Sequence, residues 1–399
     1  MRTARSTPDP AKSFDPAPRS GLAGEGRGAY HRPVSTFRYA NPAVIHWGPG
    51  SVREHLEEEV ERAGATRVLL VTTRSAVTDP ALAPAVEALL GGRLAGRVTV
   101  GQHAPARDVA AAAEAARSAR ADGLVSLGGG SPVDAAKAAA FSLATGLDLR
   151  APDAPRRARA ARLDRVLPHV AIPTTLSAAE LSSGAGFSAE GTREKVGVGA
   201  APLLPAAVIY DGALALRTPT DLWLSTGVRA VDHAVETLLA EGEHPLPDAA
   251  ALDGLRRLRA GLLAVRADPG DVAARGECQV GAWLSYLLPG PAARGLSHTL
   301  GKRLGSRHGI PHGVTSCLLL PHVLRVLAPR FPEAAARIAE VLGGGDAASA
   351  VADLVAALGL PRRLSAWNLS EGDLAEAVRP VATPEHPAEE LLGILRAAR

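Results

Sequence analysis

Cysteine and aromatic residues are scarce in this sequence. Cys278 and Cys317 are the only cysteines among 399 residues, and their spacing fits no metal site. Two such cysteines exclude a disulfide scaffold and are typical of a reducing compartment, so we expect a cytoplasmic protein. Aromatic residues make up 3% of the chain, which argues against a base-stacking surface for single-stranded nucleic acid.

Long apolar runs and a strong excess of one charge are also missing. No apolar run reaches the length that crosses a bilayer, and the N-terminal residues lack the apolar stretch of a secretory signal. The formal net charge of +3 is too small to indicate a nucleic-acid or membrane partner. Hydrophobic residues make up 46% and charged residues 21% of the chain, as in globular proteins. We therefore expect a soluble protein with no nucleic-acid and no membrane partner.

The order of periodic segments divides the chain into three parts. Residues 1–32 are rich in Pro, Gly, Ser and Arg without periodicity, which predicts a disordered extension. In residues 33–213, short apolar runs alternate with helical patterns, which predicts an α/β domain with a parallel, doubly wound sheet. In residues 214–399 only helical patterns continue, which predicts an all-α domain. We expect this domain to close over the mouth of the sheet, with the active site between the two.

The most informative stretch is residues 128–137, Gly-Gly-Gly-Ser-Pro-Val-Asp-Ala-Ala-Lys. It follows the apolar run Gly123–Leu127, which predicts a buried strand, and leads into the alanine-rich run Val133–Ala144, which predicts a helix. We expect Ser131 to be the N-cap of that helix and Pro132 to occupy its first position.

The start of this predicted helix is suited to an anion. Asp134 would complete a capping box with Ser131, so several local signals agree on where the helix begins. Gly128, Gly129 and Gly130 have no Cβ and let backbone N–H groups approach a ligand, while the helix N-terminus adds partial positive charge. We interpret the turn as a cradle for the pyrophosphate of a dinucleotide. A glycine-rich turn that binds nothing is the alternative.

Hydroxyl groups follow the predicted strand His169–Pro173. Thr174 and Thr175 come at its carboxyl end, where ligands bind in open α/β sheets, although a hydroxyl-capped turn has the same sequence pattern. After an earlier predicted strand, Arg67–Thr72, no acidic residue is available to bind an adenosine ribose. Arg74 could instead meet a 2′-phosphate, so the choice between NADH and NADPH stays open.

Two pairs of basic residues recur in the helical half. Arg229 and His233 are four residues apart and share a helix face, and Arg294 and His298 repeat this spacing. With His312 they could converge on one cleft, although each of them alone is more often a surface or hydrogen-bonded residue. A metal would need an imidazole or a carboxylate where the arginines stand, so we expect no metal. Guanidinium groups suit a carboxylate, which predicts a small anionic substrate.

These residues belong to an ordered set of motifs that resembles the iron-containing alcohol dehydrogenase superfamily, and more closely its maleylacetate reductase branch. The resemblance spans about residue 37 to the C-terminal end of the sequence. Its motifs are Gly48-Pro49-Gly50-Ser51, the stretch from Gly128 to Lys137, Ile172-Pro173-Thr174-Thr175 with Glu180, Lys195, Asp211, His233-Ala234-Val235-Glu236, His298-Thr299-Leu300-Gly301, Pro311-His312-Gly313 and Leu320-Pro321-His322.

The resemblance implies a fold and a cofactor site. The fold is an α/β N-terminal Rossmann-like domain plus an all-α C-terminal domain, the architecture of iron-type alcohol dehydrogenases and dehydroquinate synthases. The implied cofactor is NAD(P)H, and the implied assembly is a homodimer. The residues expected to bind the cofactor are Gly128, Gly129, Gly130, Ser131, Asp134, Lys137, Thr174, Thr175 and Lys195.

The resemblance also bears on the metal and on the substrate side. In metal-dependent members one Asp and three His bind the ion, and the matching positions here are Arg229, His233, Arg294 and His312. Two of these four are arginine, so iron or zinc is not expected, and the reductase branch is thought to work without that metal. Ala178-Ala179 stand where a Gly-Ser pair is expected, which removes one hydroxyl contact near the nicotinamide.

We therefore predict a metal-independent, NAD(P)H-dependent reductase of a small carbonyl or enol carboxylate, similar to maleylacetate reductases. Arg229 and Arg294 would bind the carboxylate and polarise the carbonyl, His298 or His233 would donate the proton, and His312 completes the candidate catalytic set. Proton transfer beside a stabilised enolate would equally suit a non-redox lyase, isomerase or cyclase. A binding subunit without chemistry is a third hypothesis.

Overall fold

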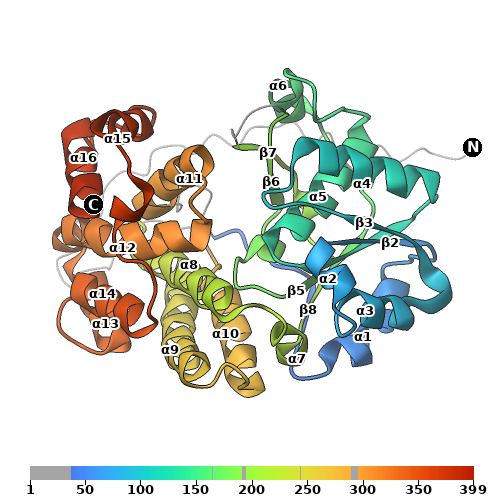
Figure 1. Ribbon diagram of the computed structural model, residues 1–399, viewed down its shortest axis with the longest axis horizontal. Coiled ribbons are helices and arrows are strands. Elements are labelled where there is room, and N and C mark those ends of the chain that lie inside the picture. The colour runs from blue at the N-terminus through green and yellow to red at the C-terminus, as the bar shows by residue number, and fades with distance from the viewer. Residues whose placement is uncertain (1–36, 164, 191–194, 243, 289–294) are drawn as a thin grey trace, which may run out of the picture. The chain divides into compact units, whose positions relative to one another are not determined.

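The computed structural model describes residues 37–163, 165–190, 195–242, 244–288 and 295–399, which belong to one compact unit (Figure 1). The predicted extension, residues 1–32, and one predicted site residue, Arg294, lie outside the described residues. No helix of the described part is long and apolar enough to cross a membrane.

A six-stranded parallel sheet organises the first half of this unit, in the order β1-β8-β5-β4-β2-β3. Its strands are β1 (Val44–Trp47), β2 (Val68–Thr72), β3 (Leu94–Thr99), β4 (Gly123–Gly128), β5 (His169–Pro173) and β8 (Ala207–Tyr210). All residues of β2, β4, β5 and β8 are buried, because helices cover both faces of a parallel sheet. The strand order reverses between β2 and β4, and ligands bind at such a reversal in open α/β sheets.

Alternate side chains of each central strand enter two different cores. Leu69 and Val71 of β2 pack in the core under α4 and α5, whereas Val68 and Leu70 pack in the core under α1 and α3 (Figure 1). This alternation follows from the two-residue period of a strand. The covering helices are α1 (Ser51–Arg62), α3 (Ala83–Leu90), α4 (Ala106–Ser118) and α5 (Gly130–Thr145).

Shorter elements border the sheet. A separate antiparallel hairpin, β6–β7, packs against α5 through β6. The bounds are α2 (Arg74–Thr78), α6 (Ala154–Ala160), β6 (Gly184–Ser188), β7 (Lys195–Gly199) and α7 (Gly212–Ala215), with short 3-10 turns η1 (Gly91–Arg93), η2 (Ala179–Leu181) and η3 (Ala201–Leu203).

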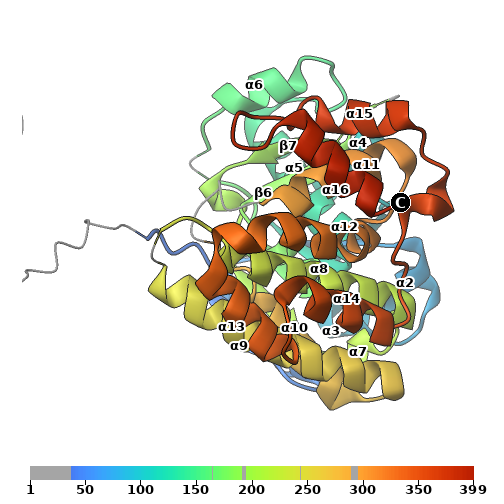
Figure 2. The same cartoon turned by 90° about the vertical axis from the view of Figure 1, so that its left-hand side faces the viewer.

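The second half of the unit is helical within its described residues. Its helices are α8 (Thr220–Leu238), α9 (Pro245–Ala267), α10 (Val272–Leu284), α11 (Leu296–His308), α12 (His312–Leu327), α13 (Pro332–Leu342), α14 (Ala347–Ala357), α15 (Glu371–Val378) and α16 (Ala388–Ala397), with 3-10 turns η5 (Ala328–Arg330) and η6 (Leu364–Trp367). Figure 2 views this half with α12 beside α8 and α14, which it contacts. The parallel sheet and the helical half confirm the predicted fold class.

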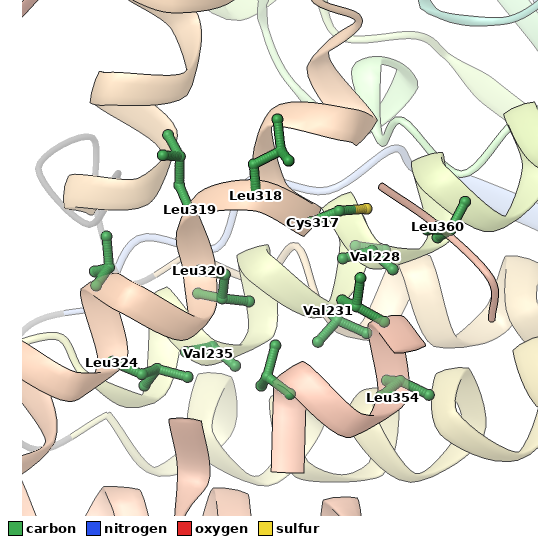
Figure 3. Packing of buried hydrophobic residues seen from close by; sticks show 14 of the residues in the cluster. Val228, Val231, Val235, Cys317, Leu318, Leu319, Leu320, Leu324, Leu354 and Leu360 are labelled. Atoms are coloured by element: carbon green, nitrogen blue, oxygen red, sulfur yellow. The ribbon is translucent and has the colours of Figure 1, made fainter. Parts of the chain in front are cut away.

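The core of the helical half lies between α8 and α12. Figure 3 shows Val231 and Val235 of α8 near Leu320 and Leu324 of α12, with Leu354 of α14 beside them. All five side chains are at most 5% exposed. One face of α8 is therefore fixed in the core, and another can present side chains toward the sheet.

The start of α5 differs from the prediction. Helix α5 begins at Gly130, with Gly129 as N-cap and no side-chain cap bond, so the expected cap at Ser131 and the expected capping box with Asp134 are wrong. The Ser131 hydroxyl instead accepts a hydrogen bond of 2.9 Å from the backbone N–H of His103. The Ser131 hydroxyl, expected to cap its own helix, thus binds the backbone of the loop at His103 instead.

Candidate active site

A cavity of ≈ 730 Å³ lies at the carboxyl ends of β2 and β4 and is closed by residues of α8, α11 and α12. Its volume is within the range of small-molecule sites, about 300–1,000 Å³. The cavity brings together eleven of the predicted site residues: Gly128, Gly129, Gly130, Ser131, Asp134, Thr174, Thr175, Arg229, His233, His298 and His312.

The glycine turn forms one wall of this cavity. Gly128 has φ +136°, which glycine tolerates and other residues rarely adopt, and a Cβ there would lie 2.9 Å from Pro132 Cγ. A Cβ on Gly129 would lie 3.1 Å from Thr175 Cγ2. No side chain caps the first turn of α5, so its N–H groups are available to an anion. The turn therefore fits the pyrophosphate of a dinucleotide.

Three hydroxyl residues, Thr174, Thr175 and Ser177, lie next to the glycine turn. Thr174 is held by its N–H, which donates to Gly128 O at 2.9 Å, and by its carbonyl, which accepts from Thr218 Oγ1 at 2.6 Å. Ser177 Oγ would lie 3.1 Å from a Cβ built on Gly130. It is buried and has no hydrogen-bond partner within the described part of the chain. Because buried hydroxyls are normally hydrogen-bonded, Ser177 is a candidate contact for a ligand in the cradle.

The two predicted lysines contribute differently. Lys137 is fully buried and its ammonium donates to the carbonyls of Ala179 (2.8 Å), Ser182 (3.2 Å) and Gly184. These contacts join α5 to the segment before β6, and Lys137 is not among the residues that line the cavity. Lys195 is the first residue of β7, and its side chain is outside the described structure.

A buried carboxyl group lies in the same segment. Tyr210 Oη donates to Glu180 Oε1 at 2.8 Å, whereas Glu180 Oε2 has no partner among the described residues. Burial raises the pKa of Glu180 to about 7, although the Tyr210 hydroxyl and the positive charge of Lys137 lower it. The segment around η2 thus carries a carboxyl group that titrates close to neutral pH.

Arg229 places a guanidinium group in the helical wall of the cavity. The residue is 7% exposed, and its Nη1 donates to Asp232 Oδ2 at 3.1 Å and to Ser316 Oγ at 3.0 Å. Its Nη2 donates to His298 Nδ1. Asp232 Oδ2 also accepts from Ser297 Oγ at 2.9 Å and from Ser316 Oγ at 2.6 Å. Side chains from α8, α11 and α12 therefore fix the direction of this guanidinium.

Two buried carboxyl groups lie behind Arg229. Burial raises the pKa of Asp232, while Arg229 and the hydroxyls of Ser316 and Ser297 lower it again. Burial and the neighbouring Asp232 raise the pKa of Glu236 to about 8. Glu236 Oε1 accepts a hydrogen bond of 2.8 Å from the backbone N–H of His298. The carboxyl group of Glu236 thus fixes the start of α11.

The predicted histidines line the same cavity as the guanidinium. The ring centroid of His233 lies 5.9 Å from that of His298 and 4.9 Å from that of Tyr286. His312 begins α12, and its ring centroid lies 5.6 Å from that of His103. His233, His298, His312 and Arg229 thus come from three helices and line one cavity. Arg294, the other member of the predicted set, lies outside the described residues.

The donor set does not fit iron or zinc. Among the residues that the structure describes, no three His, Cys, Asp or Glu side chains are arranged to hold a metal ion. The guanidinium of Arg229 contacts His298, and it would repel a divalent cation beside it.

Several residues of this site were not predicted from the sequence. Asp232 is three residues from Arg229, a spacing that brings charges together on a helix, so this ion pair had a signal in the sequence. Ser297 and Ser316 lie on other helices, and only the packing of α8, α11 and α12 brings them to Asp232. Ser177 lacked any pattern that distinguishes it from other loop serines.

Two family models match this chain. The model described as iron-containing alcohol dehydrogenase matches residues 42–212, and the model for the C-terminal part of the iron-containing alcohol dehydrogenase family matches residues 223–389. Together they cover most of the described residues.

Individual proteins agree with this match. The chain is 32% identical over 351 residues to maleylacetate reductase of Sphingobium indicum, covering 87% of this chain and 90% of that protein. It is 34% identical over 343 residues to maleylacetate reductase of Rhizobium sp., covering 86% and 89%. The crystal structure of maleylacetate reductase from Agrobacterium tumefaciens is similar with a TM-score of 0.77 and 31% identity, over 92% of this chain and 98% of that one. The chain therefore belongs to the iron-containing alcohol dehydrogenase family of oxidoreductases, on its maleylacetate reductase-like branch.

Proposed function

We propose that this protein is a metal-independent, NAD(P)H-dependent reductase of a small carbonyl or enol carboxylate. The observation that carries the proposal is one cavity with a glycine cradle on the sheet side and a fixed guanidinium on the helical side. The similarity to maleylacetate reductases supports reduction of an organic acid by a nicotinamide cofactor.

The cofactor would extend along the carboxyl ends of the strands. The first turn of α5 and the hydroxyl of Ser177 would bind the pyrophosphate, with Thr174 and Thr175 around it. Arg74, which lines the cavity after β2, lies where a Rossmann-type sheet binds the adenosine ribose. Since Asp134 is the only acidic residue among those that line the cavity, the adenosine end suits a 2′-phosphate better than a free hydroxyl pair. We therefore propose NADPH as the preferred cofactor.

The substrate would lie against the helical wall. Arg229 offers a cation that is already desolvated and held by Asp232 and Ser316, so little reorganisation is needed when negative charge develops. A guanidinium binds a carboxylate through two parallel hydrogen bonds or polarises a carbonyl oxygen. Arg294 would add a second guanidinium, and it lies outside the described residues.

The bound cofactor supplies the hydride. Reduction of a carbonyl in this way would leave an oxygen that needs a proton, and the protein would have to donate it. His298 and His233 both line the cavity beside Arg229, and imidazole is suited to proton donation near neutral pH. The contact between Arg229 and His298 Nδ1 orients that ring.

The test is turnover with and without metal. The purified protein is dialysed against a strong chelator and offered small 2-oxo and enol carboxylates with NADPH or NADH, and consumption of the reduced nicotinamide is followed by absorbance. We expect turnover to survive chelation and to be faster with NADPH. Activity that returns only when Fe²⁺ or Zn²⁺ is added would contradict metal independence. A protein that binds neither cofactor would favour the lyase, isomerase or cyclase hypothesis.

A further inference from the structure

The helical half contains a second hollow, of ≈ 580 Å³, apart from the active-site cavity. It is lined by residues of α12 and α14, by the segment around residues 361–366 and by Ala397 of α16. Figure 2 shows α12, α14 and α16 close together in this half. The two hollows share no lining residue.

The rim of the second hollow carries positive charge without an acidic neighbour. None of its lining residues is Asp or Glu, and its basic residues are His322, Arg325, Arg362 and Arg363. None of these three arginines has a carboxylate within 4.0 Å in the described part of the chain.

Several other arginines of this half do form ion pairs. Arg330 pairs with Glu390 at 2.8 Å, and Arg396 and Arg399 both pair with Glu371, at 3.1 and 3.0 Å. The arginines around the hollow are therefore not explained as members of surface ion pairs.

His322 lies close to two of these arginines. Arg325 Nη1 donates to His322 Nδ1 at 2.9 Å. Burial lowers the pKa of His322 first, and the charges of Arg325 and Arg363 lower it further. Two guanidinium groups thus act on one half-buried ring, and no lining carboxylate offsets them.

Apolar residues form one part of the lining, which we call the floor. The floor includes Pro321 of α12, Ala352 and Val355 of α14, and Ala397 of α16. Cys317 also lines it, but its Sγ donates to Gly313 O at 3.3 Å and burial raises the pKa of its thiol, so it stays protonated and unreactive. The hollow therefore combines a cationic rim with a floor that can pack against hydrocarbon.

We propose that this hollow is a binding site for an organic anion whose carboxylate or phosphate lies between Arg325 and Arg363 and whose apolar body packs on the floor. A combination of a few charged groups with an apolar lining is what small-molecule sites have in common. The site is independent of the reductase chemistry proposed above, because it uses none of the same residues.

The test uses phenyl phosphate and benzoate as probes, with inorganic phosphate as the probe that has no apolar body. Binding is measured by calorimetry on the full-length protein, its Arg325→Ala/Arg363→Ala variant and the control Arg337→Ala. Arg337 is an exposed arginine of α13 that lines neither hollow and has no carboxylate within 4.0 Å among the described residues. Circular dichroism and the melting temperature establish that each variant is folded.

We expect the double variant to bind phenyl phosphate at least tenfold more weakly than the wild type and the control to bind it within twofold. Arg229→Met, which alters the other cavity, should keep this binding. Whether phenyl phosphate or benzoate binds more tightly tells which anionic group the site prefers. Equal binding by the double variant and the wild type would overturn the proposal, as would equal affinity for inorganic phosphate. A change of oligomeric state in the double variant would also overturn it, since the arginines would then belong to an interface.

Discussion

Replacing Asp232 by Asn tests how far the position of Arg229 depends on its counter-charge. Arg229 is 7% exposed, and its Nη1 lies 3.1 Å from Asp232 Oδ2. Asn keeps an oxygen that accepts from Ser297 and Ser316. It leaves Arg229 without a counter-charge, and a guanidinium cannot become neutral by losing its proton. Breaking a buried ion pair costs about 3–5 kcal/mol. Because the hydroxyl contacts stay and the guanidinium borders a cavity, we expect the free energy of unfolding to fall by about 3 kcal/mol, the lower end of that range.

The opposite change, Arg229→Met, should cost less at low pH. The stability cost is smaller because the carboxyl group of Asp232, left without its partner, can become neutral by binding a proton. Burial already raises the pKa of Asp232 above 3.8, and loss of the neighbouring cation raises it further. Between the two pKa values of Asp232, the folded state holds a proton that the unfolded chain has released. The free energy of unfolding therefore falls as the pH rises from the pKa of the unfolded chain through the pKa of the folded state. We expect this loss to be larger in Arg229→Met than in the wild type, and we expect the extra loss to disappear when Asp232 is also replaced.

The double variant Arg229→Met/Asp232→Asn completes the cycle. With both charges gone, we expect its free energy of unfolding to lie within about 1 kcal/mol of the wild type, while kcat falls about 10²–10³-fold because the fixed cation is lost. Urea unfolding followed by tryptophan fluorescence gives the free energies of unfolding. The control is the exposed pair Arg256 and Asp253, replaced in the same way, for which we expect the free energy of unfolding to change by less than about 1 kcal/mol. Losses of the two single variants that simply add in the double variant would refute the reasoning.

Three further predictions concern the sheet side of the cavity. Arg74→Ala should reduce kcat/KM for NADPH about tenfold, the value of one hydrogen bond to a charged group, and leave NADH unchanged; an equal fall with both cofactors would argue against a 2′-phosphate contact. Gly130→Ala should weaken cofactor binding measured by calorimetry about tenfold, because its Cβ would lie 3.1 Å from Ser177 Oγ. The stability of the protein should not fall, since Ala favours the helix more than Gly does. Unchanged affinity would show that the cradle is unused. The free energy of unfolding of Glu180→Gln should gain up to about 3 kcal/mol over that of the wild type as the pH rises from 5 to 8. The reason is that burial raises the pKa of Glu180 to about 7 in the folded state, against 4.5 in the unfolded chain, whereas the amide of Gln stays neutral. Parallel curves of stability against pH for the two proteins would contradict this.

Much of the fold was predictable because its strands are buried on both faces. Runs such as Gly123–Leu127 and His169–Pro173 are apolar without alternation, as central parallel strands are. The disappearance of such runs in the second half predicts the helical half for the same reason. Both features depend only on local composition, so they can be predicted from one sequence without knowledge of long-range contacts.

The details of the site depend on contacts between distant segments, and there local reasoning was weaker. Ser131 satisfies every rule for an N-cap, yet the N–H of His103 takes its hydroxyl. Lys137 was predicted at the cofactor, yet its ammonium joins three carbonyls of a segment more than forty residues away. The convergence of Arg229, His233, His298 and His312 was predictable from helical spacing and motif order, whereas the serines that hold Asp232 were not.

On the function proposed above, the way Arg229 is held has a consequence for how the enzyme would become active. A cation that is part of a side chain is present in every folded copy, in fixed stoichiometry, and needs no uptake or loading after synthesis. Oxygen or scarcity of trace elements does not remove it. In exchange, a guanidinium has one geometry and no open coordination position, which narrows the range of groups that it can activate to those with planar, anionic oxygens.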